Sequence, residues 1–177
     1  MFEGLQAIGN ADARARLVRY LDCLLRWSPR INLTGAQDEK QAFETLIRPI
    51  LGAEDLLADP VIDVGSGNGS PGLILAALRP DLEFILLEPR AKRWAFLRDA
   101  AREMKAANVT VRRERSDGYG GPKAAVVTMR AVGLDPEALR PLIAPGGALL
   151  VFGGPELPGT ETIKLPSGST VQRRCFT

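Results

Sequence analysis

The sequence predicts an α/β fold in which a mainly parallel sheet carries helices and follows a helical N-terminal cap. Apolar residues recur at helical spacing from about Asp12 to Trp27, which indicates an amphipathic helix. Further along, a strand, a glycine-rich turn, a helix and a second strand follow one another between Val61 and Leu87. Alternating strands and helices then continue toward the C-terminus, which is typical of a parallel sheet.

The length of 177 residues fits one domain, with residues 1–55 as the helical cap and 56–177 as the sheet-containing core. The composition, 45% hydrophobic and 25% charged, is that of an average globular protein and argues against a disordered, fibrous or membrane class. We see no internal repeat or linker, and we expect a monomer.

The cap is expected to hold two helices. The first is broken by Pro29 and Gly35, because proline cannot donate a backbone hydrogen bond and glycine favours turns. The second runs from about Glu39 to Ile47 and ends before Pro49.

The core is expected to contain parallel strands joined by right-handed crossovers, closed by a C-terminal hairpin around Pro166, Ser167 and Gly168. The strands are expected at Val61–Val64, Leu82–Leu87, Val109–Arg113, Ala124–Thr128, the ALLVF run after the turn APGG, Thr162–Lys164 and Thr170–Phe176, and the helices at about Pro71–Leu78, Ala91–Ala106 and Pro136–Leu142.

Several classes of chemistry are excluded or disfavoured by composition. The chain has no histidine, which removes Ser-His-Asp and Cys-His catalysis and histidine-ligated metals. Cys23 and Cys175 lie far apart without metal-ligand spacing, so we expect ordinary thiols and no metal. No apolar run approaches the roughly 18 residues of a spanning helix, and the first residues lack the order of a secretory signal, so we expect a cytoplasmic protein with no membrane partner.

The turn after the first core strand is the candidate ligand site. Gly65, Gly67, Gly69 and Gly72 crowd it, and glycine permits positive φ and a close approach of backbone to ligand. In open parallel sheets the first strand-to-helix turn is the usual place for a nucleotide-like cofactor. The alternative is a tight turn into the helix with no ligand.

The details of the turn favour S-adenosylmethionine over a nicotinamide dinucleotide. The register that begins at Gly65 places Ser70 where the dinucleotide fingerprint needs glycine or alanine, and the literal GxGxxG from Gly67 contains Pro71. Asp63 would repel a pyrophosphate but would attract the sulfonium and ammonium groups of S-adenosylmethionine.

Glu88 ends the second core strand, where a carboxylate can accept hydrogen bonds from both hydroxyls of a ribose. This position supports an adenosine cofactor without choosing between the two candidates. A solvated acid at a strand end is the alternative.

Four segments together resemble the RsmG (GidB) family of bacterial methyltransferases: DVGSGNGSPG at Asp63–Gly72, LLEPRAKRWAFLR at Leu86–Arg98, NVTV at Asn108–Val111 and TMRA at Thr128–Ala131. The upstream RWSPRINLTG at Arg26–Gly35 resembles the family's W-N-x-x-x-N-L-T stretch, so the similarity covers roughly Leu17 to Gly154. The resemblance implies a class I, Rossmann-like, S-adenosylmethionine-dependent enzyme that methylates N7 of a guanine in small-subunit (16S) ribosomal RNA.

The resemblance also assigns residues. It implies that Gly65, Ser66, Gly67 and Ser70 border the methionine end of the cofactor. Glu88 would hold the ribose, in line with the strand-end argument.

At the other end of the cofactor, the resemblance implies that Ser116 and Asp117 border the adenine. Arg130 would lie beside the cofactor and the target base, where it could position the reaction, although a surface arginine at a strand end is the alternative. The family's R-H-x-x-D-S stretch appears here as residues 48–53, which keep the arginine, Arg48, but lose the histidine, the aspartate and the serine.

A basic segment indicates the RNA partner, which would be small-subunit ribosomal RNA or the small ribosomal subunit. Residues 90–115 carry nine basic and three acidic side chains, and such clusters neutralise phosphates. We expect Arg48, Arg90, Lys92 and Arg93 to contact RNA, and a C-terminal group of Lys164, Arg173 and Arg174 to add basic charge; a solvated helix face is the alternative.

The chemistry is compatible with the absence of histidine. Guanine N7 exposes a lone pair in the neutral base, so methyl transfer needs in-line placement and no general base. Three other functions remain open. The first is a methyltransferase for another RNA or a small molecule, which the altered residues 48–53 favour, and the second is a degenerate paralogue that binds cofactor or RNA without turnover. The third is an NAD-dependent oxidoreductase, against which Asp63, Ser70 and the missing histidine count.

Overall fold

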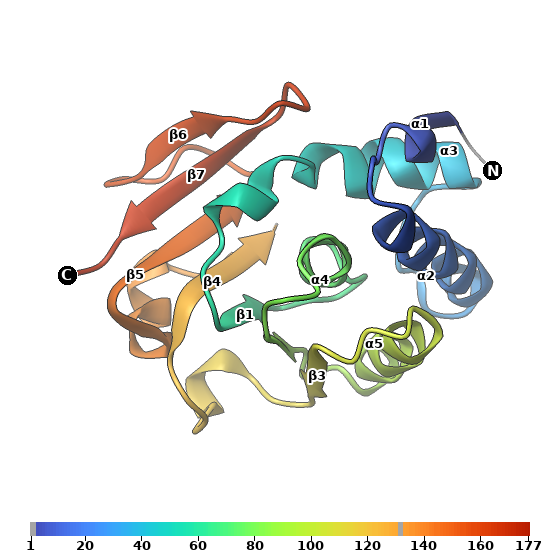
Figure 1. The fold of residues 1–177 in the computed structure, drawn as a ribbon. Helices are drawn as coiled ribbons and strands as arrows, with labels where there is room; N and C mark the ends of the chain where they lie inside the picture. The colour runs from blue at the N-terminus through green and yellow to red at the C-terminus, as the bar shows by residue number, and fades with distance from the viewer. Residues whose placement is uncertain (1–2, 131–132) are drawn as a thin grey trace.

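The computed structural model describes residues 3–130 and 133–177, and within them the strands form one seven-stranded sheet in the order β3-β2-β1-β4-β5-β7-β6 (Figure 1). Neighbours from β3 to β5 pair in parallel, and β7 pairs antiparallel with both β5 and β6. The strands are β1 (Val61–Val64), β2 (Phe84–Leu87), β3 (Val109–Arg112), β4 (Ala124–Arg130), β5 (Ile143–Phe152), β6 (Glu161–Lys164) and β7 (Thr170–Cys175).

The longest helices cover one face of the sheet. α2 packs against both α4 and α5, and in Figure 1 these three helices lie on the same side of the strands. The α-helices are α1 (Glu3–Gln6), α2 (Ala11–Ile31), α3 (Glu39–Ala42), α4 (Gly72–Leu78) and α5 (Ala91–Glu103); the other helical turns are η1 (Phe43–Ile47), η2 (Arg48–Ile50), η3 (Ala53–Leu56), η4 (Ser116–Gly118) and η5 (Pro136–Leu142). We refer to α1 through η3 as the helical cap.

The two faces of the sheet have separate apolar cores. The larger core joins α2, α4, α5 and the cap to the sheet, and fully buried Leu21, Leu73 and Phe96 belong to it. The smaller core lies under η5 and includes Leu139 and Leu149. Among the described residues, the second face is covered by the 3₁₀ helix η5, whereas α2, α4 and α5 cover the first.

The predicted strand–turn–helix–strand unit is confirmed, and so are the C-terminal hairpin and the helices at α4 and α5. The turn predicted at Ala144–Gly147 is wrong, because β5 runs through these residues with an irregular register opposite Ala124 and Val126. A positive φ at Gly146 lets the strand pass through this irregularity without ending. The helix predicted at Pro136–Leu142 is a 3₁₀ helix.

The expected break at Pro29 is also wrong, because α2 continues to Ile31. Pro29 stands in the last turn, where its missing amide removes one hydrogen bond and leaves the rest of the helix intact. The helix instead ends at Asn32, which has a φ of 51° and donates its amide to the Ser28 carbonyl at 2.9 Å.

The second cap helix begins at Glu39 as expected, but its hydrogen bonding changes along its length. After α3 it becomes the π-helix η1, and then the 3₁₀ turn η2 carries the chain past Pro49. Pro49 has no amide for an α-helical bond, which accounts for the change of helix type beside it. No helix in the described part of the chain is both long and apolar enough to cross a membrane.

Candidate cofactor and RNA site

The glycine turn lies at the carboxyl end of β1 and is tied to β2. The Gly65 and Ser66 amides both donate to the Leu87 carbonyl, at 2.9 and 3.2 Å. Gly65, Gly67 and Gly69 have φ values of 69°, 50° and 89°, a conformation that side chains rarely tolerate. The turn therefore needs glycine for its backbone shape.

Glu88 closes this turn from the neighbouring strand. Its Oε2 accepts the Gly67 amide at 3.0 Å, and its Oε1 accepts the Arg90 amide at 2.9 Å. The side chain is 2% exposed, so the carboxylate is held in one place. A Cβ added to Gly67 would point between the Gly65 carbonyl, at 3.5 Å, and Glu88 Oε2, at 4.0 Å. The missing Cβ thus leaves a space bordered by two hydrogen-bond acceptors and, at 3.6 Å, by the donor Arg93 Nη1, a mixed polar lining that fits the hydroxyls of a ribose.

Asp63 is fully buried beneath the turn. Its Oδ1 accepts the Thr128 hydroxyl at 2.6 Å, while its Oδ2 has no hydrogen-bond partner in the structure. A Cβ on Gly72 would approach Oδ2 to 2.6 Å, so the first residue of α4 must be small. Burial raises the pKa of Asp63 to about 6, against the lowering effect of the Thr128 hydroxyl. Because Asp63 is fully buried beneath the turn, its charge and not a direct contact is what it offers to that side of the turn.

The serines of the turn use their hydroxyls within the protein. Ser66 Oγ donates to the Asp63 carbonyl at 3.0 Å, and Ser70 Oγ donates to the Leu46 carbonyl at 2.8 Å. Arg130, at the end of β4, donates to Ser70 Oγ at 2.5 Å. The structure thus brings these predicted residues to one edge of the sheet. Ala131 of the TMRA segment lies outside the described residues.

Ser116 and Asp117 lie at the same edge, in η4 just after β3. The Glu88 amide donates to the Arg112 carbonyl at 3.1 Å, which fixes the end of β3 beside Glu88. Asp117 is exposed and pairs with Arg115 at 3.1 Å, and this pair lowers the pKa of Asp117.

Tyr20 and Asn68 also support the turn, and neither was expected from the sequence. The Tyr20 hydroxyl, fully buried in α2, donates to the Asn68 carbonyl at 2.8 Å. Asn68 Nδ2 donates to the Leu33 carbonyl at 3.2 Å. Leu33 lies within the RWSPRINLTG segment that resembles the family, so the sequence did indicate that this loop belongs near the site. Tyr20 looks like another core residue of α2, and nothing in the sequence indicated its role.

The expected RNA-binding residues lie beside this edge, except one. Arg90 and Lys92 are exposed at the start of α5, where they line a cavity of about 400 Å³ with Ile31. Arg93 reaches over the turn, with Nη1 3.6 Å from the position of a Cβ on Gly67. Arg48 instead pairs with Glu44 at 2.6 Å and lines a different cavity, between the cap and the C-terminal hairpin.

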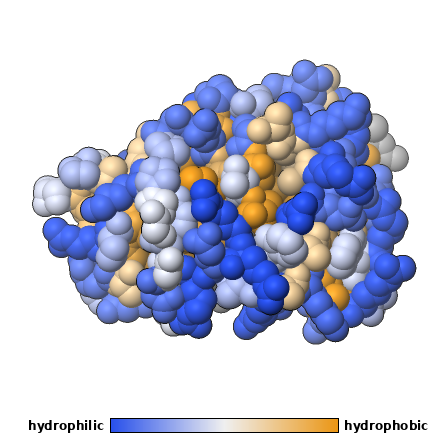
Figure 2. All heavy atoms as spheres, turned by 90° about the horizontal axis from the view of Figure 1, so that it is seen from below, coloured by the Kyte–Doolittle hydropathy of each residue, from blue (hydrophilic) through white to orange (hydrophobic). Residues whose placement is uncertain are grey.

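Much of the remaining basic charge is paired. Arg173 binds Glu161 at 2.5 Å, and Arg174 binds Glu137, so the C-terminal basic group is largely neutralised by acids distant in sequence. In the 90–115 segment Arg102, Arg112 and Arg115 are likewise paired with acids. Figure 2, seen from the side where β3 forms the edge of the sheet, shows a largely hydrophilic face with a small apolar group near its middle.

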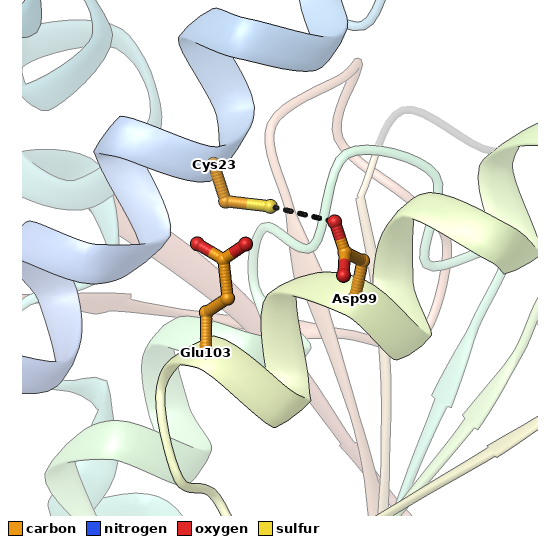
Figure 3. A group of neighbouring side chains, drawn as sticks. All are labelled: Cys23, Asp99 and Glu103. Atoms are coloured by element: carbon orange, nitrogen blue, oxygen red, sulfur yellow. Dashed lines mark hydrogen bonds between the residues drawn. The ribbon is translucent and has the colours of Figure 1, made fainter.

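One group of possible metal ligands lies between α2 and α5, where Cys23, Asp99 and Glu103 place their ligand atoms within 4.8 Å of one another (Figure 3). Both carboxylates are already engaged, Asp99 by Arg102 at 2.5 Å and Glu103 by Arg26 at 2.6 Å. Burial, together with these two acids, raises the pKa of the Cys23 thiol to about 12. A metal needs a thiolate, so the cluster is better explained as a polar contact between two helices.

The sheet order, the glycine turn and the acid at the end of β2 define the class I, S-adenosylmethionine-dependent methyltransferases. Solved structures support this fold: a methyltransferase from Geobacter sulfurreducens (TM-score 0.60, 12% identity, 89% of this chain and 87% of that chain) and an S-adenosylmethionine-dependent methyltransferase from Aquifex aeolicus (TM-score 0.57, 11% identity, 79% and 95%).

The family follows from sequence. The GidB model, described as rRNA small subunit methyltransferase G, matches residues 13–159, and the chain belongs to this family. It is similar to the ribosomal RNA small subunit methyltransferase G of Halorhodospira halophila, 38% identical over 93% of this chain and 80% of the relative. That of Xanthomonas axonopodis pv. citri is 36% identical over 95% and 82%.

Proposed function

We propose that this protein transfers the methyl group of S-adenosylmethionine to N7 of a guanine in 16S ribosomal RNA. The observation that carries the proposal is the space over Gly67, which Glu88 Oε2 borders on one side and Arg93 Nη1, from the basic start of α5, on the other. An adenosine site and a phosphate-binding surface would thus be adjacent. Family membership supports the RNA substrate.

Different residues of the site would hold different parts of the cofactor. The backbone of Gly65, Ser66, Gly67 and Ser70 would border the methionine end, Glu88 would accept the ribose hydroxyls, and the η4 pair Ser116 and Asp117 would border the adenine. The buried carboxylate of Asp63 would favour the positive charge of the donor. When bound, S-adenosylmethionine supplies an electrophilic methyl group on a cationic sulfur.

The protein's task in this reaction is placement. The lone pair of guanine N7 forms the new bond to the methyl carbon while the carbon–sulfur bond breaks, so the base gains the positive charge and adenosylhomocysteine leaves neutral at sulfur. No proton moves, and no general base is required. The part of the site that the structure describes accordingly needs neither histidine nor metal for this step.

Arg90, Lys92 and Arg93 would contact RNA phosphates beside the cofactor. Arg48 would contact RNA only at the outer side of the cap, because it lines the cavity near the C-terminal hairpin. We further propose that the chain works as one methyltransferase domain, as a monomer, in the cytoplasm.

The test is methyl transfer from labelled S-adenosylmethionine to small ribosomal subunits that lack the modification, followed by nuclease mapping of the label. Label at a single guanine N7 is the expected result. Label on another RNA or at another atom would contradict the proposed substrate. Binding of adenosylhomocysteine without any transfer, on subunits that a known active relative does methylate, would show a paralogue that has lost turnover.

A further inference from the structure

Arg130 joins three parts of the molecule that are distant in sequence. From the end of β4 its Nη2 donates to the Thr45 carbonyl at 2.6 Å, and its Nη1 donates to the Leu46 carbonyl at 3.3 Å and to Ser70 Oγ at 2.5 Å. Ser70 Oγ in turn donates to the same Leu46 carbonyl. One guanidinium thereby links β4, the glycine turn and the cap.

The Thr45 carbonyl is available because of the local sequence. In an α-helix the Thr45 carbonyl would receive the amide of residue 49, but Pro49 has none. The segment adopts the π-helix η1 and the 3₁₀ turn η2 instead, and Arg130 supplies donors where the helix lacks one. This arrangement therefore depends on Pro49.

Arg130 also forms part of a cavity wall. A cavity of about 770 Å³ lies between the 34–38 loop, α3 and η1, and Thr45, Leu46 and Arg130 line it. Arg130 connects this wall to the glycine turn through its hydrogen bond to Ser70, and the volume of the cavity is in the range of ordinary ligand sites. The cap wall of this cavity is therefore fastened to the turn that would hold the methyl donor.

We propose that Arg130 is a positioning residue for methyl transfer, which fixes the cap wall of this cavity relative to the glycine turn. This rests on the proposed function, in which the base enters beside the cofactor. Its guanidinium acts through the Thr45 and Leu46 carbonyls and Ser70, so its effect is on the alignment of nucleophile, methyl carbon and sulfur. Misalignment of about 1 Å costs roughly a hundredfold in rate in such reactions.

The test compares Arg130→Lys and Arg130→Met with Arg79→Met. Arg79 is a matched control, because its Nη1 donates to another cap carbonyl, that of Glu54, at 3.0 Å, yet it does not line the cavity. We expect Arg130→Met to lower kcat on small subunits about 10- to 100-fold, with the Kd for adenosylhomocysteine changed by no more than about threefold. Arg130→Lys should restore part of kcat, since an ammonium reaches one of the acceptors. Arg79→Met should lower Tm similarly and leave kcat nearly unchanged.

A loss of kcat that tracks the loss of Tm across all three variants would overturn the proposal. So would a rise in the KM for RNA with kcat intact, which would make Arg130 a simple RNA contact. If the unaltered protein methylates no small subunit, the proposed function fails, and amide hydrogen exchange of residues 43–50 then decides the positioning claim separately. Faster exchange there in Arg130→Lys, but not in Arg79→Met, supports the fastening; equal exchange contradicts it.

Discussion

Glu88 accepts the backbone amide of Gly67 at 3.0 Å, although the two residues follow different strands and lie 21 positions apart. This contact joins the carboxylate that would hold the ribose to the turn that would hold the methionine part. It makes the cofactor site dependent on the register of β1 against β2, in which Val64 pairs with Leu87. The proposed adenosine site thus depends on how these two strands pair.

Replacing Glu88 by alanine should weaken both the fold and the site. The buried Gly67 amide and the partly buried Arg90 amide would lose their acceptor, at a cost of about 1–3 kcal/mol in the free energy of unfolding. We expect affinity for adenosylhomocysteine to fall roughly 10- to 100-fold, since charged hydrogen bonds to the ribose would be lost. Calorimetric titration and denaturant unfolding measure the two effects. Glu88→Gln retains an acceptor oxygen, so it should recover most of the stability and little of the affinity; equal recovery of both would count against the ribose role.

Alanine at Gly67 and at Gly72 should separate binding from folding. At Gly67 the new methyl group would meet nothing closer than 3.5 Å but would enter the proposed ribose gap, at a φ of 50°. We expect a stability cost of about 1 kcal/mol and a loss of cofactor affinity greater than about tenfold. At Gly72 the methyl group would lie 2.6 Å from Asp63 Oδ2, so we expect mainly a loss of stability, of about 1–3 kcal/mol. Thermal unfolding and adenosylhomocysteine titration of both variants provide the comparison, which the reverse pattern would contradict.

Asp63 should make stability and cofactor affinity depend on pH in opposite directions. Its pKa of about 6 in the folded protein exceeds its ordinary value of 3.8, so between these values the folded state binds more protons than the unfolded state. The free energy of unfolding should therefore fall by roughly 2–3 kcal/mol from pH 4 to pH 6 on account of this group.

The affinity for S-adenosylmethionine should rise over the same pH range, because ionised Asp63 attracts the sulfonium. Adenosylhomocysteine, which lacks that charge, should gain less. Asp63→Asn removes the titrating carboxylate and should flatten both profiles. Titrations of the two ligands between pH 5 and pH 7 give the comparison, and a profile unchanged in Asp63→Asn would assign the effect to another group.

Charge reversal of Arg90 and Lys92 should weaken RNA binding while sparing the cofactor. Both side chains are exposed at the start of α5, so folding should be little affected. We expect the KM for small subunits to rise about tenfold or more, with a smaller dependence on salt, because fewer phosphate counterions are displaced. Lys123→Glu serves as the control, since Lys123 precedes β4 at the opposite edge of the sheet. Equal effects of the two changes would point to a general field effect and against a local contact.

The sequence was sufficient for the parts of the fold that depend on local pattern. The run Val61–Val64, the glycines after it and Glu88 are close in sequence to the elements that they define, so the strand, the turn and the acid at the next strand end were all predicted. The family segments then extended this to Arg130, whose place at the sheet edge the structure confirms.

What the sequence did not reveal depends on contacts between distant residues. Glu137 offsets the positive charge of Arg174, one of the basic residues expected at the C-terminus, and nothing local to either residue indicates this pairing. Pro29 was interpreted as a helix breaker. The energetic cost of a proline in a helix depends on how close it lies to the helix end, and here that end is set by Asn32, three residues later. The bonds from Arg130 to the carbonyls that η1 presents were also not indicated, because those residues lie about 85 positions away in the sequence.

A crystal structure with bound adenosylhomocysteine tests the central claim most directly. The ribose hydroxyls should lie within hydrogen-bond distance of Glu88, beside the backbone of Gly65 and Gly67, with the adenine near Ser116 and Asp117. An adenosylhomocysteine molecule bound elsewhere, with the gap between Gly67 and Glu88 empty, would contradict the account.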